Sequence, residues 1–524
     1  MQSLSALMNQ LSIKVDDCEI KQICDDSRKV SKDDLFVCIP CANDLENAKQ
    51  AVANGAKVLV AQAKILKHFE KQITPFAINK SQEMDSRFRE NDRKEDHCHP
   101  LEKGDPFMEN GIICIKHENP RLALSQLAKA YYNHQPSTLV AVTGTNGKSS
   151  VVSLIRQLWH LLGYKSASFG TVGLEIDDSY YPDSLQKVPS LTTYDSLSFF
   201  KLLSDLTISG INHVVFEASS HGLDQYRIHG SNITAASFTN LTQDHLDYHK
   251  DMESYLQAKI KLFKEVLPSD QPAILNANSP YFAQIKNQIS NPVFSYGTDS
   301  KADIHATNVE VSGTKIIFDL HYQKQTFHSV TLNLAGAFQL ENTLCAIATL
   351  MSNGTPLESI VSLLPLLKSV SGRMELIGST ETGADVYVDY AHTPDALEKS
   401  LLELKKIKSG NGLLRVIFGC GGDRDRGKRP LMGQVAADIA DFVVVTDDNP
   451  RYENASEIRK QILAECPGAS EIPSRADAIA KAIEERRPGD IVLIAGKGHE
   501  TYQLIGDQVL PFNDVEEVQK YVRL

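Results

Sequence analysis

The chain has 524 residues, a length that favours about three domains of ordinary size. With 42% hydrophobic and 23% charged residues, it can form ordinary globular cores. A formal net charge of −12 argues against a general nucleic-acid binder or a protein that docks on anionic membranes. No apolar run is long enough to span a bilayer, and the first residues lack the basic and apolar segments of a signal peptide. We therefore expect a cytoplasmic protein without membrane insertion.

The nine cysteines are scattered and odd in number, which favours a reducing compartment over a disulfide framework. Cys38 and Cys41 have a spacing seen in zinc sites, and Cys98 lies between His97 and His99. Because no second pair of cysteines accompanies Cys38 and Cys41, we do not expect a zinc site.

Residues 1–135 have the pattern of a small α/β unit. The strand and helix patterns in it cover 34–39, 47–54, 57–61, 112–115 and 120–132. Residues 81–111 interrupt the unit with a stretch that is mostly charged and poor in apolar side chains. Such a segment cannot bury enough surface to offset the entropy lost on ordering, so we expect an exposed insertion.

A candidate phosphate-binding loop follows a linker at 134–137. The apolar run 139–142 favours a buried strand, G-T-N-G-K-S occupies 144–149, and the apolar residues of 151–162 recur at helical spacing. The two glycines let backbone N–H groups approach phosphates, and the helix N-terminus adds positive potential. Lys148 would reach the outer phosphates and the Ser149 hydroxyl a magnesium ion. The glycines are closer together than in the common P-loop, so a plain turn before a helix is the alternative.

Two further stretches of the central region carry chemistry. The strand 214–216 ends in Glu217, and an acid at the carboxyl end of a parallel strand beside a phosphate loop can hold magnesium. The strand 235–239 leads into N-L-T-Q-D-H-L-D-Y-H at 240–249, which is rich in metal-binding and proton-transferring groups. Taken alone, this His/Asp loop is more typical of a solvated turn.

Residues 373–524 alternate strands and helices, which indicates a doubly wound, mostly parallel sheet. The strand patterns cover 386–389, 414–418, 442–446 and 491–495, and a helix covers 394–407. Polar loops follow the strands, where α/β folds bind ligands; they cover 389–392, 421–429, 447–451 and 496–500. The basic loop 421–429 contains acids and lacks nearby aromatics, which favours binding of a small carboxylate or phosphate over nucleic acid.

Taken together, the motifs resemble those of the Mur ligase family over nearly the whole chain except 81–111. They are, in order, T-G-T-N-G-K-S, E-A-S-S-H-G-L-D-Q-Y-R, T-N-L-T-Q-D-H-L-D-Y-H, Y-L-Q-A-K, S-G-R-M-E, D-Y-A-H-T-P-D, G-G-D-R-D-R-G-K-R-P, D-D-N-P-R and G-K-G-H-E. The resemblance implies an α/β protein of three domains. A smaller domain at 1–135 would bind the UDP-substrate, a central P-loop ATPase-like domain with a mostly parallel sheet would span 136–372, and a Rossmann-like amino-acid domain would span 373–524.

The resemblance also implies the reaction, an ATP-dependent ligation in peptidoglycan precursor synthesis. ATP phosphorylates the terminal carboxylate of a UDP-N-acetylmuramoyl dipeptide, and the amine of meso-diaminopimelate displaces phosphate from the acyl phosphate. Such chemistry depends on positioning and charge neutralisation. We expect small-molecule partners only, no nucleic acid, and a monomer.

By the same resemblance, Lys148 stabilises the transferring phosphoryl group, and Ser149 and Glu217 hold one Mg²⁺. A second Mg²⁺ would lie near Glu217 and His245, bridged by Lys259 of Y-L-Q-A-K as a carbamate (N6-carboxylysine), which is an oxygen ligand suited to magnesium. Without the motif, Lys259 reads as a solvated helix lysine. The implied ATP-binding set is Gly144, Thr145, Asn146, Gly147, Lys148, Ser149, Asn342, Arg373, Asp389 and Tyr390.

The substrate sets are carried over in the same way. For the UDP-substrate they are Ser27, Thr192, Thr193, Ser219, Gln225 and Arg227; for diaminopimelate they are Arg424, Asp448, Asn449, Pro450, Arg451, Gly496 and Glu500. Arg451 would bind the carboxylate that diaminopimelate has and lysine lacks, with Arg424 as a second partner and Glu500 at the neighbouring ammonium. The alternative is that Arg451 caps the following helix or lies in solvent.

Two departures and three rival functions accompany this interpretation. Gln339 stands where the family usually has Asn, and the loop around Asn43 and Asp44 lacks the expected glycine-bearing uridine motif. The rivals are a lysine-adding ligase of the same family, a folate polyglutamate ligase, and a P-loop switch or binding protein that uses ATP without forming a bond.

Overall fold

The computed structural model describes residues 2–9, 11, 18–70, 107–109, 112–176, 191–312, 315–379, 384–408 and 411–522. Its contacts divide the chain into two compact units. Unit 1 comprises Met1–Asn133, Asp195–Ser204 and Gln225–Ser231, and unit 2 comprises His134–Tyr194, Asp205–Asp224 and Asn232–Leu524. The domain boundaries near 135 and 372 stay predictions.

Unit 1 is built on a five-stranded sheet in the order β3-β4-β5-β7-β6. β3 (Ile23–Cys24), β4 (Leu35–Val37), β5 (Val58–Ala61) and β7 (Ile112–Lys116) are parallel, and β6 (Phe107–Glu109) is antiparallel. The remaining elements are β1 (Gln2–Ser3), α1 (Leu4–Asn9), β2 (Glu19–Ile20), η1 (Ser27–Lys29), α2 (Asp44–Ala53), α3 (Ala63–Glu70) and α4 (Pro120–Tyr131).

β6 corrects the expected extent of the insertion. Residues 107–109 belong to the stretch that we expected to be looped out, yet they pair with β7 from Phe107 opposite Cys114 to Glu109 opposite Ile112. The physical reason is that the outer edge of β7 offers unpaired backbone groups, which a short return strand satisfies. Residues 71–106 and 110–111, the rest of the expected insertion among them, lie outside the described residues.

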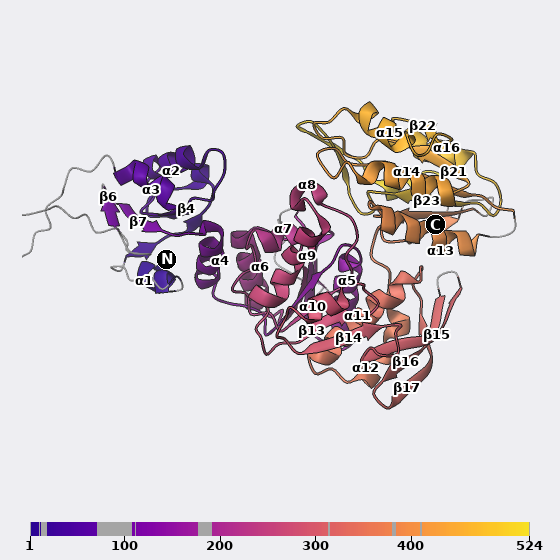
Figure 1. Cartoon of the computed structure of the whole chain (residues 1–524), viewed down its shortest axis with the longest axis horizontal. Helices are drawn as coiled ribbons and strands as arrows, with labels where there is room; N and C mark the ends of the chain where they lie inside the picture. Colours follow the sequence, from indigo (N-terminus) through magenta and orange to yellow (C-terminus); the bar gives the residue numbers. More distant parts are fainter. Residues whose placement is uncertain are drawn as a thin grey trace, which may run out of the picture. The chain divides into compact units, whose positions relative to one another are not determined.

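Unit 2 contains a ten-stranded sheet in the order β10-β9-β11-β8-β12-β13-β14-β15-β16-β17. Figure 1 labels β13 to β17 of this sheet. Its strands are β8 (Thr138–Thr143), β9 (Ser166–Gly170), β10 (Gly173–Ile176), β11 (His213–Glu217), β12 (Ala235–Phe238), β13 (Ala273–Asn276), β14 (Val293–Gly297), β15 (Ile304–Ser312), β16 (Lys315–Tyr322) and β17 (Gln325–Leu332). β8 lies between β11 and β12, all parallel, and the register sets Glu217 opposite Val142. The acid therefore stands level with the start of the phosphate loop.

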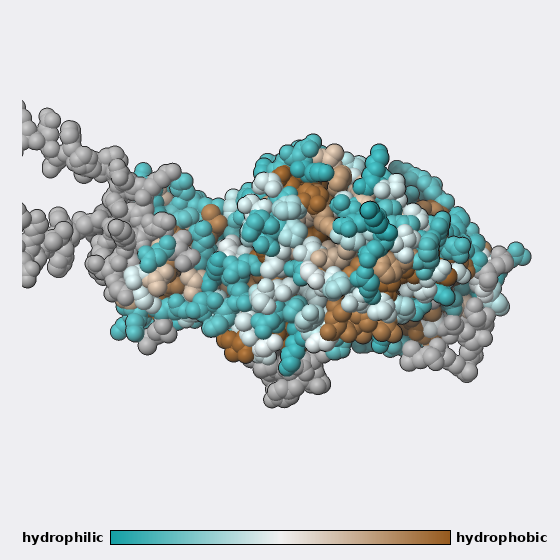
Figure 2. All heavy atoms as spheres, turned by 90° about the horizontal axis from the view of Figure 1, so that it is seen from below, coloured by the Kyte–Doolittle hydropathy of each residue, from teal (hydrophilic) through white to brown (hydrophobic). Residues whose placement is uncertain are grey.

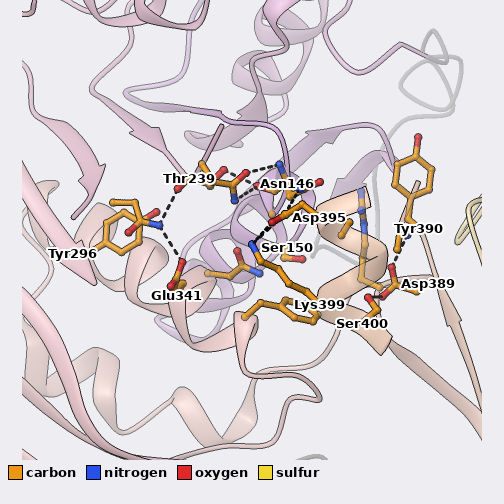
Figure 3. Close-up of a pocket in the computed structure, with 18 residues that line it drawn as sticks. Asn146, Ser150, Thr239, Tyr296, Glu341, Asp389, Tyr390, Asp395, Lys399 and Ser400 are labelled. Carbon is orange, nitrogen blue, oxygen red and sulfur yellow. Dashed lines mark hydrogen bonds and ion pairs between the residues drawn. The ribbon is translucent and has the colours of Figure 1, made fainter. Parts of the chain in front are cut away.

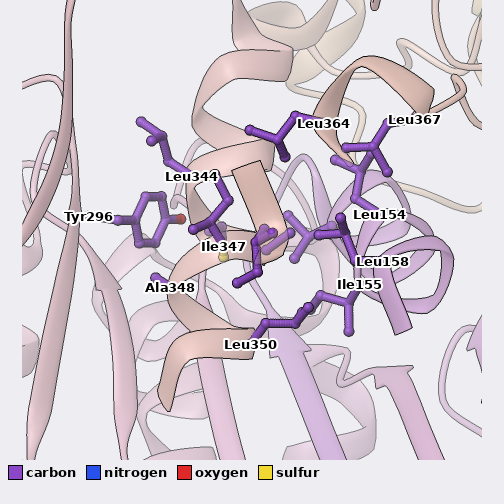
Figure 4. Packing of buried hydrophobic residues seen from close by; sticks show 14 of the residues in the cluster. Leu154, Ile155, Leu158, Tyr296, Leu344, Ile347, Ala348, Leu350, Leu364 and Leu367 are labelled. Atoms are coloured by element: carbon purple, nitrogen blue, oxygen red, sulfur yellow. The ribbon is translucent and has the colours of Figure 1, made fainter. Parts of the chain in front are cut away.

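The helices of this part of unit 2 are mostly short, and two long ones make its main core. They are α5 (Lys148–Leu161), α7 (Ser220–Asp224), α8 (Leu246–His249), α9 (Met252–Lys261), η3 (Leu262–Val266), α10 (Phe282–Lys286), α11 (Phe338–Ser352), α12 (Leu357–Val361) and η4 (Leu364–Leu366). α6 (Ser196–Ile208) is divided between the units, and its residues up to Ser204 belong to unit 1. Leu154 and Leu158 of α5 pack with Leu344 and Ile347 of α11 in one buried cluster (Figure 4). This burial fixes α5, and hence its N-terminus, against the sheet.

Residues 375 to 522 form the doubly wound sheet that the sequence predicts. Its order is β18-β19-β23-β20-β21-β22, with only β18 antiparallel. Separate buried clusters cover the two faces of this sheet: one includes Leu397 and Met432, the other Ile479 and Val518. The elements are β18 (Glu375–Ser379), β19 (Asp385–Asp389), α13 (Pro394–Ile407), β20 (Leu414–Phe418), α14 (Lys428–Ile439), β21 (Phe442–Val445), α15 (Ala455–Leu463), β22 (Ser470–Glu471), α16 (Arg475–Glu484), β23 (Ile491–Ala495), β24 (Tyr502–Ile505), β25 (Gln508–Pro511) and α17 (Asp514–Gln519).

Hydrophilic residues spread over the face shown in Figure 2, and hydrophobic residues form separate patches between them. Among the described helices, none combines the length and the apolar character that crossing a membrane requires.

Candidate active site

The phosphate loop turns sharply from β8 into α5 and depends on its two glycines. Gly144 and Gly147 have φ angles of 147° and 84°, a region that side chains disfavour. A Cβ at Gly144 would lie 1.9 Å from Thr239 Oγ1, and one at Gly147 would lie 2.5 Å from Asn342 Oδ1. Lys148 donates from Nζ to the carbonyl oxygens of Gly144 (3.1 Å) and Thr145 (2.8 Å). Burial lowers the pKa of Lys148.

Ser149 and Glu217, the expected magnesium pair, are in contact. The Ser149 hydroxyl donates to Glu217 Oε1 at 2.8 Å, and the Glu217 residue is only 2% exposed. Thr171 donates to the same carboxylate twice, from its backbone N to Oε1 (2.9 Å) and from Oγ1 to Oε2 (3.1 Å). No Lys, Arg or His nitrogen of the described residues forms an ion pair with Glu217. A buried carboxylate held by neutral donors alone favours binding of a cation.

The sequence did not single out the cradle around Glu217. β9 ends in Gly170, where a Cβ would lie 2.4 Å from Glu217 Oε1, and Thr171 follows. The only signal for these residues is the dipeptide G-T at the end of the short segment S-A-S-F, whose strand neighbours β11. Small side chains at such a position are too common to indicate a site.

Lys259 is buried in α9 and is not a solvated lysine. The residue is 1% exposed, its Nζ donates to Gly144 O at 2.8 Å, and it lies 4.3 Å from the ring centroid of Tyr255. Burial, reinforced by the nearby charge of Lys148, lowers its pKa well below the usual value. Lys261, two residues on, instead pairs with Asp224 at 2.7 Å. Burial favours the uncharged form of an amine, which is the form that acts as a nucleophile, and this direction fits the expected carbamate.

The His/Asp loop is buried in part and solvated in part: Asp244 and His249 are buried, whereas Asp247 and Tyr248 are exposed. His245 has a φ angle of 57° and is the N-cap of α8. Asp244 lies 3.2 Å from Lys428 Nζ, 3.5 Å from His245 Nε2 and 3.6 Å from His392 Nε2. Burial raises the pKa of Asp244, but Lys428 and the two histidines outweigh it and the net pKa falls well below normal. Burial lowers the pKa of His245 to about 3, so the ring is neutral and suited to a metal.

A pocket adjoins the phosphate loop (Figure 3). Six residues of the expected ATP set line it: Asn146, Gly147, Asn342, Arg373, Asp389 and Tyr390. Arg373 donates from Nη2 to Ser149 Oγ at 2.8 Å, and its guanidinium lies 4.3 Å from the Tyr390 ring centroid. The sequence missed Asp395, which accepts from Asn146 Nδ2 at 2.8 Å, and Lys399 beside it.

Asp389 and Gln339 hold neighbouring groups in place by hydrogen bonds. Asp389 accepts from the backbone N of Met374 (2.8 Å) and of Ala391 (2.6 Å), so its carboxylate orders the chain around Arg373; burial raises its pKa. Gln339, the departure from the family pattern, accepts from Asn342 Nδ2 at 3.0 Å. It therefore orients the retained asparagine.

A second pocket, of about 520 Å³, holds most of the expected amino-acid set. Arg424, Asp448, Asn449, Arg451, Gly496 and Glu500 line it, and Pro450 does not. Arg451 donates from Nη1 to Gly422 O at 2.9 Å, and burial followed by the charge of Arg424 lowers its pKa. The N-cap of α15 is Asn454, so Arg451 does not cap this helix.

Residues of its own loop and of D-D-N-P-R hold the carboxylate of Glu500 by hydrogen bonds. Lys497, with a 0% exposed side chain, donates from Nζ to Glu500 Oε2 at 2.9 Å. Asn449 Nδ2 donates to the same oxygen at 2.9 Å. The sequence reading passed over Lys497, although it stands inside G-K-G-H-E.

The expected UDP-substrate residues fall in both units. Ser27, Gln225 and Arg227 belong to unit 1, and Thr192, Thr193 and Ser219 to unit 2. Ser27 Oγ donates to Gln50 Oε1 at 2.7 Å, and Arg227 Nη2 to Gln225 Oε1 at 2.9 Å. Thr193 is buried and donates to the Glu217 carbonyl at 2.8 Å. Thr192 Oγ1 lies 3.1 Å from Thr171 Oγ1, and Ser219 N donates to Thr193 Oγ1 at 2.8 Å. In the loop that lacks the expected uridine motif, Asp44 pairs with Lys64 at 2.9 Å and Asn43 is the N-cap of α2.

Within the described residues, no three His, Cys, Asp or Glu side chains are grouped to hold a metal ion. Cys38 is buried and donates to Asp44 O at 3.1 Å, whereas Cys41 is exposed. Cys98 and its flanking histidines lie outside the described residues.

Comparison with known proteins identifies the family. Residues 142–350 match the Mur ligase middle domain, and residues 372–498 match the Mur ligase glutamate ligase domain. A UDP-N-acetylmuramoyl-L-alanyl-D-glutamate–2,6-diaminopimelate ligase of Rickettsia prowazekii is 46% identical over 77% of this chain and 84% of its own length. The chain belongs to the Mur ligase family.

Solved structures agree with this. A UDP-N-acetylmuramoyl-L-alanyl-D-glutamate–2,6-diaminopimelate ligase, 30% identical, covers 99% of both chains with a TM-score of 0.64. A MurF ligase of Thermotoga maritima in complex with ADP shares the fold at 14% identity, with a TM-score of 0.57 over 95% of this chain and 96% of that one. The expected fold class, α/β with a doubly wound C-terminal sheet, is confirmed.

Proposed function

We propose that this chain is an ATP-dependent, ADP-forming ligase that adds meso-diaminopimelate to UDP-N-acetylmuramoyl-L-alanyl-D-glutamate through an acyl phosphate. One observation carries the proposal: the pocket containing Arg424, Arg451 and Glu500 shares a wall with the phosphate pocket. Thr171, Thr192, Asp244, His245, Tyr390 and His392 line both. An amine held in the first pocket is therefore adjacent to a carboxylate that is phosphorylated in the second, as attack of the amine on the acyl carbon and release of phosphate require.

The residues of the phosphate pocket fit magnesium and ATP. Glu217 is a buried carboxylate without a described cationic partner, and Ser149 places a hydroxyl beside it, which are oxygen ligands of the kind Mg²⁺ prefers. Bound Mg²⁺ would neutralise phosphate charge. Lys148 would bind the transferring phosphoryl group, and Arg373 would stack on Tyr390 beside the nucleotide. Lys259 and His245 are the proposed ligands of a second Mg²⁺, with Lys259 as its carbamate.

The amino-acid pocket favours diaminopimelate over lysine on grounds of charge. The two substrates differ by one carboxylate beside the far amine. Arg424 and Arg451 supply two guanidinium groups to this pocket, and a guanidinium binds a carboxylate with two parallel hydrogen bonds. Glu500 would bind the ammonium next to that carboxylate. A lysine would leave the arginines without an anionic partner.

The rival functions differ in what they leave unexplained. A lysine-adding ligase of the same family does not need Arg451 at the pocket wall. A folate polyglutamate ligase does not account for the D-D-N-P-R loop or for the sheet of unit 1. A switch that binds ATP without forming a bond needs neither the buried Lys259 nor the second pocket. The proposal includes the cytoplasmic location and the monomeric state that we expect from the sequence.

A product assay tests the proposal directly. Purified protein is incubated with ATP, magnesium, UDP-N-acetylmuramoyl-L-alanyl-D-glutamate and either meso-diaminopimelate or L-lysine, and the tripeptide product and ADP are measured. We expect product and ADP in equal amounts with diaminopimelate and little with lysine. A preference for lysine would favour the first rival, and ATP hydrolysis that ignores both amines would favour the switch.

A further inference from the structure

His499 belongs to the loop that lines the amino-acid pocket, but it contacts the other side of the site. Its Nε2 lies 3.0 Å from the carbonyl oxygen of Thr171. Because a carbonyl only accepts, Nε2 carries the proton. Its Nδ1 is buried and has no hydrogen-bond partner among the described residues. Burial lowers the pKa of His499 to about 4, so the ring is neutral and presents one fixed donor.

Thr171 links His499 to Glu217 by hydrogen bonds. Its backbone N and its Oγ1 donate to the two oxygens of the Glu217 carboxylate, at 2.9 and 3.1 Å. Its carbonyl accepts from His499. Three groups of one residue thus link the G-K-G-H-E loop to the acid of the phosphate pocket, and Thr171 lines both pockets.

The backbone of His499 makes a second link to the same acid. It packs against Gly372, where a Cβ would lie only 2.3 Å from His499 N. The next residue, Arg373, donates to Ser149 Oγ at 2.8 Å, and Ser149 donates to Glu217 at 2.8 Å. His499 therefore touches both segments that orient the Ser149–Glu217 pair.

We propose that His499 is a positioning residue that couples the amino-acid pocket to the Ser149–Glu217 pair through Thr171. It touches none of the reacting atoms. Its neighbour Glu500 lines the amino-acid pocket, so an amino acid bound there stabilises the loop in the position that lets His499 hold Thr171. Phosphoryl transfer is then fastest when the amine is in place. This inference rests on the proposed function and adds a link between its two half-sites.

Two substitutions separate the donor from the ring. His499→Phe keeps a ring but removes the N–H donor, and His499→Gln keeps an amide donor near the Nε2 position. For His499→Phe we expect kcat to fall about tenfold, as loss of one positioning hydrogen bond does. We expect the KM for diaminopimelate to change less than about twofold, since Arg424, Arg451 and Glu500 remain. His499→Gln should recover most of kcat.

A binding measurement gives a readout that does not depend on turnover. In calorimetric titration with a non-hydrolysable ATP analogue and magnesium, His499→Phe should bind several-fold more weakly than wild type at limiting magnesium, because Glu217 is less well oriented. His328→Phe is the matched control, since His328 lies on β17 with a 75% exposed side chain. It should match wild type in both measurements.

The outcomes that overturn the coupling are distinct. A His499→Phe variant with wild-type kcat and wild-type magnesium dependence overturns it, as does one that changes only the KM for diaminopimelate. If His499→Phe fails to fold, His499→Asn is combined with Thr171→Val, which removes the Oγ1 bond to Glu217. If the fold-decrease in kcat of the double variant equals the product of the two single decreases, the two residues act independently and the coupling is overturned. A smaller decrease supports a shared route. If wild-type protein does not ligate diaminopimelate, the proposed function fails, and the nucleotide titration still decides the coupling.

Discussion

The phosphate pocket and the amino-acid pocket are built in different ways. One contiguous loop, 144–149, forms a continuous wall of the phosphate pocket, and its backbone admits no side chain at Gly144 or Gly147. The amino-acid pocket comes from loops after separate strands, and its charged groups are braced by other side chains, as Lys497 and Asn449 brace Glu500. The first should therefore govern the rate of the chemistry, and the second the choice of amine.

The largest effect should come from the buried amine of the phosphate pocket. Lys259→Ala removes the proposed carbamate, and we expect ligation to fall by about 1,000-fold or more, equivalent to about 4 kcal/mol of transition-state stabilisation. Added short carboxylates should restore part of the rate. The assay is product formation at saturating substrates, and full activity in Lys259→Ala would contradict the assignment.

Lys261→Ala is the matched control for this change. Lys261 is on the same helix two residues away, but its Nζ binds Asp224 and its side chain is 24% exposed. We expect less than about a twofold change in rate, because such pairs contribute little. Equal losses in both variants would point to damage to α9 instead of lost chemistry.

Arg451→Ala should separate the second pocket from the first. Loss of a buried, charged hydrogen-bonding partner costs about 2–5 kcal/mol, so the KM for diaminopimelate should rise by about 30-fold or more. The affinities for ATP and the UDP-substrate should stay near wild type. Arg426→Ala is the control from the basic loop, because Arg426 is 68% exposed and pairs with Glu453. An unchanged affinity for diaminopimelate in Arg451→Ala would refute the proposed carboxylate site.

The smallest effect on either pocket should come from the polar segment of the first unit. An exposed insertion over 81–111 predicts that deleting about 83–110 is harmless, but that deletion removes β6. Deletion of 83–105 should change activity and thermal stability little, because it spares β6 and removes mostly charged residues. Deletion of 83–110 should lower the melting temperature by several degrees, since it exposes the edge of β7. Equal melting temperatures for the two deletions would show that β6 contributes nothing.

Much of this protein was predictable from sequence because the signals are local. The helix 394–407 and the strands 414–418 and 491–495 were placed with the bounds that the structure has. The apolar periodicity and the caps that predict these elements lie within a few residues of each other. The phosphate loop G-T-N-G-K-S is likewise a contiguous motif. The family motifs likewise predicted that Glu217, Lys259 and Arg451 belong to the binding sites, and all three line the pockets. Their individual roles stay proposals.

The sequence by itself determined the fold class, the phosphate loop and the motifs that carry most of the candidate site, because each is written in contiguous residues. Only the tertiary structure decided which groups serve those residues. Thr171, Lys497, Asp395 and the Asp244–Lys428 pair were found by geometry, since a bond from His499 to a backbone carbonyl leaves no mark on the sequence at Thr171. The burial that lowers the pKa of Lys259 was likewise decided by packing, because the desolvation of an amine depends on what surrounds it in space.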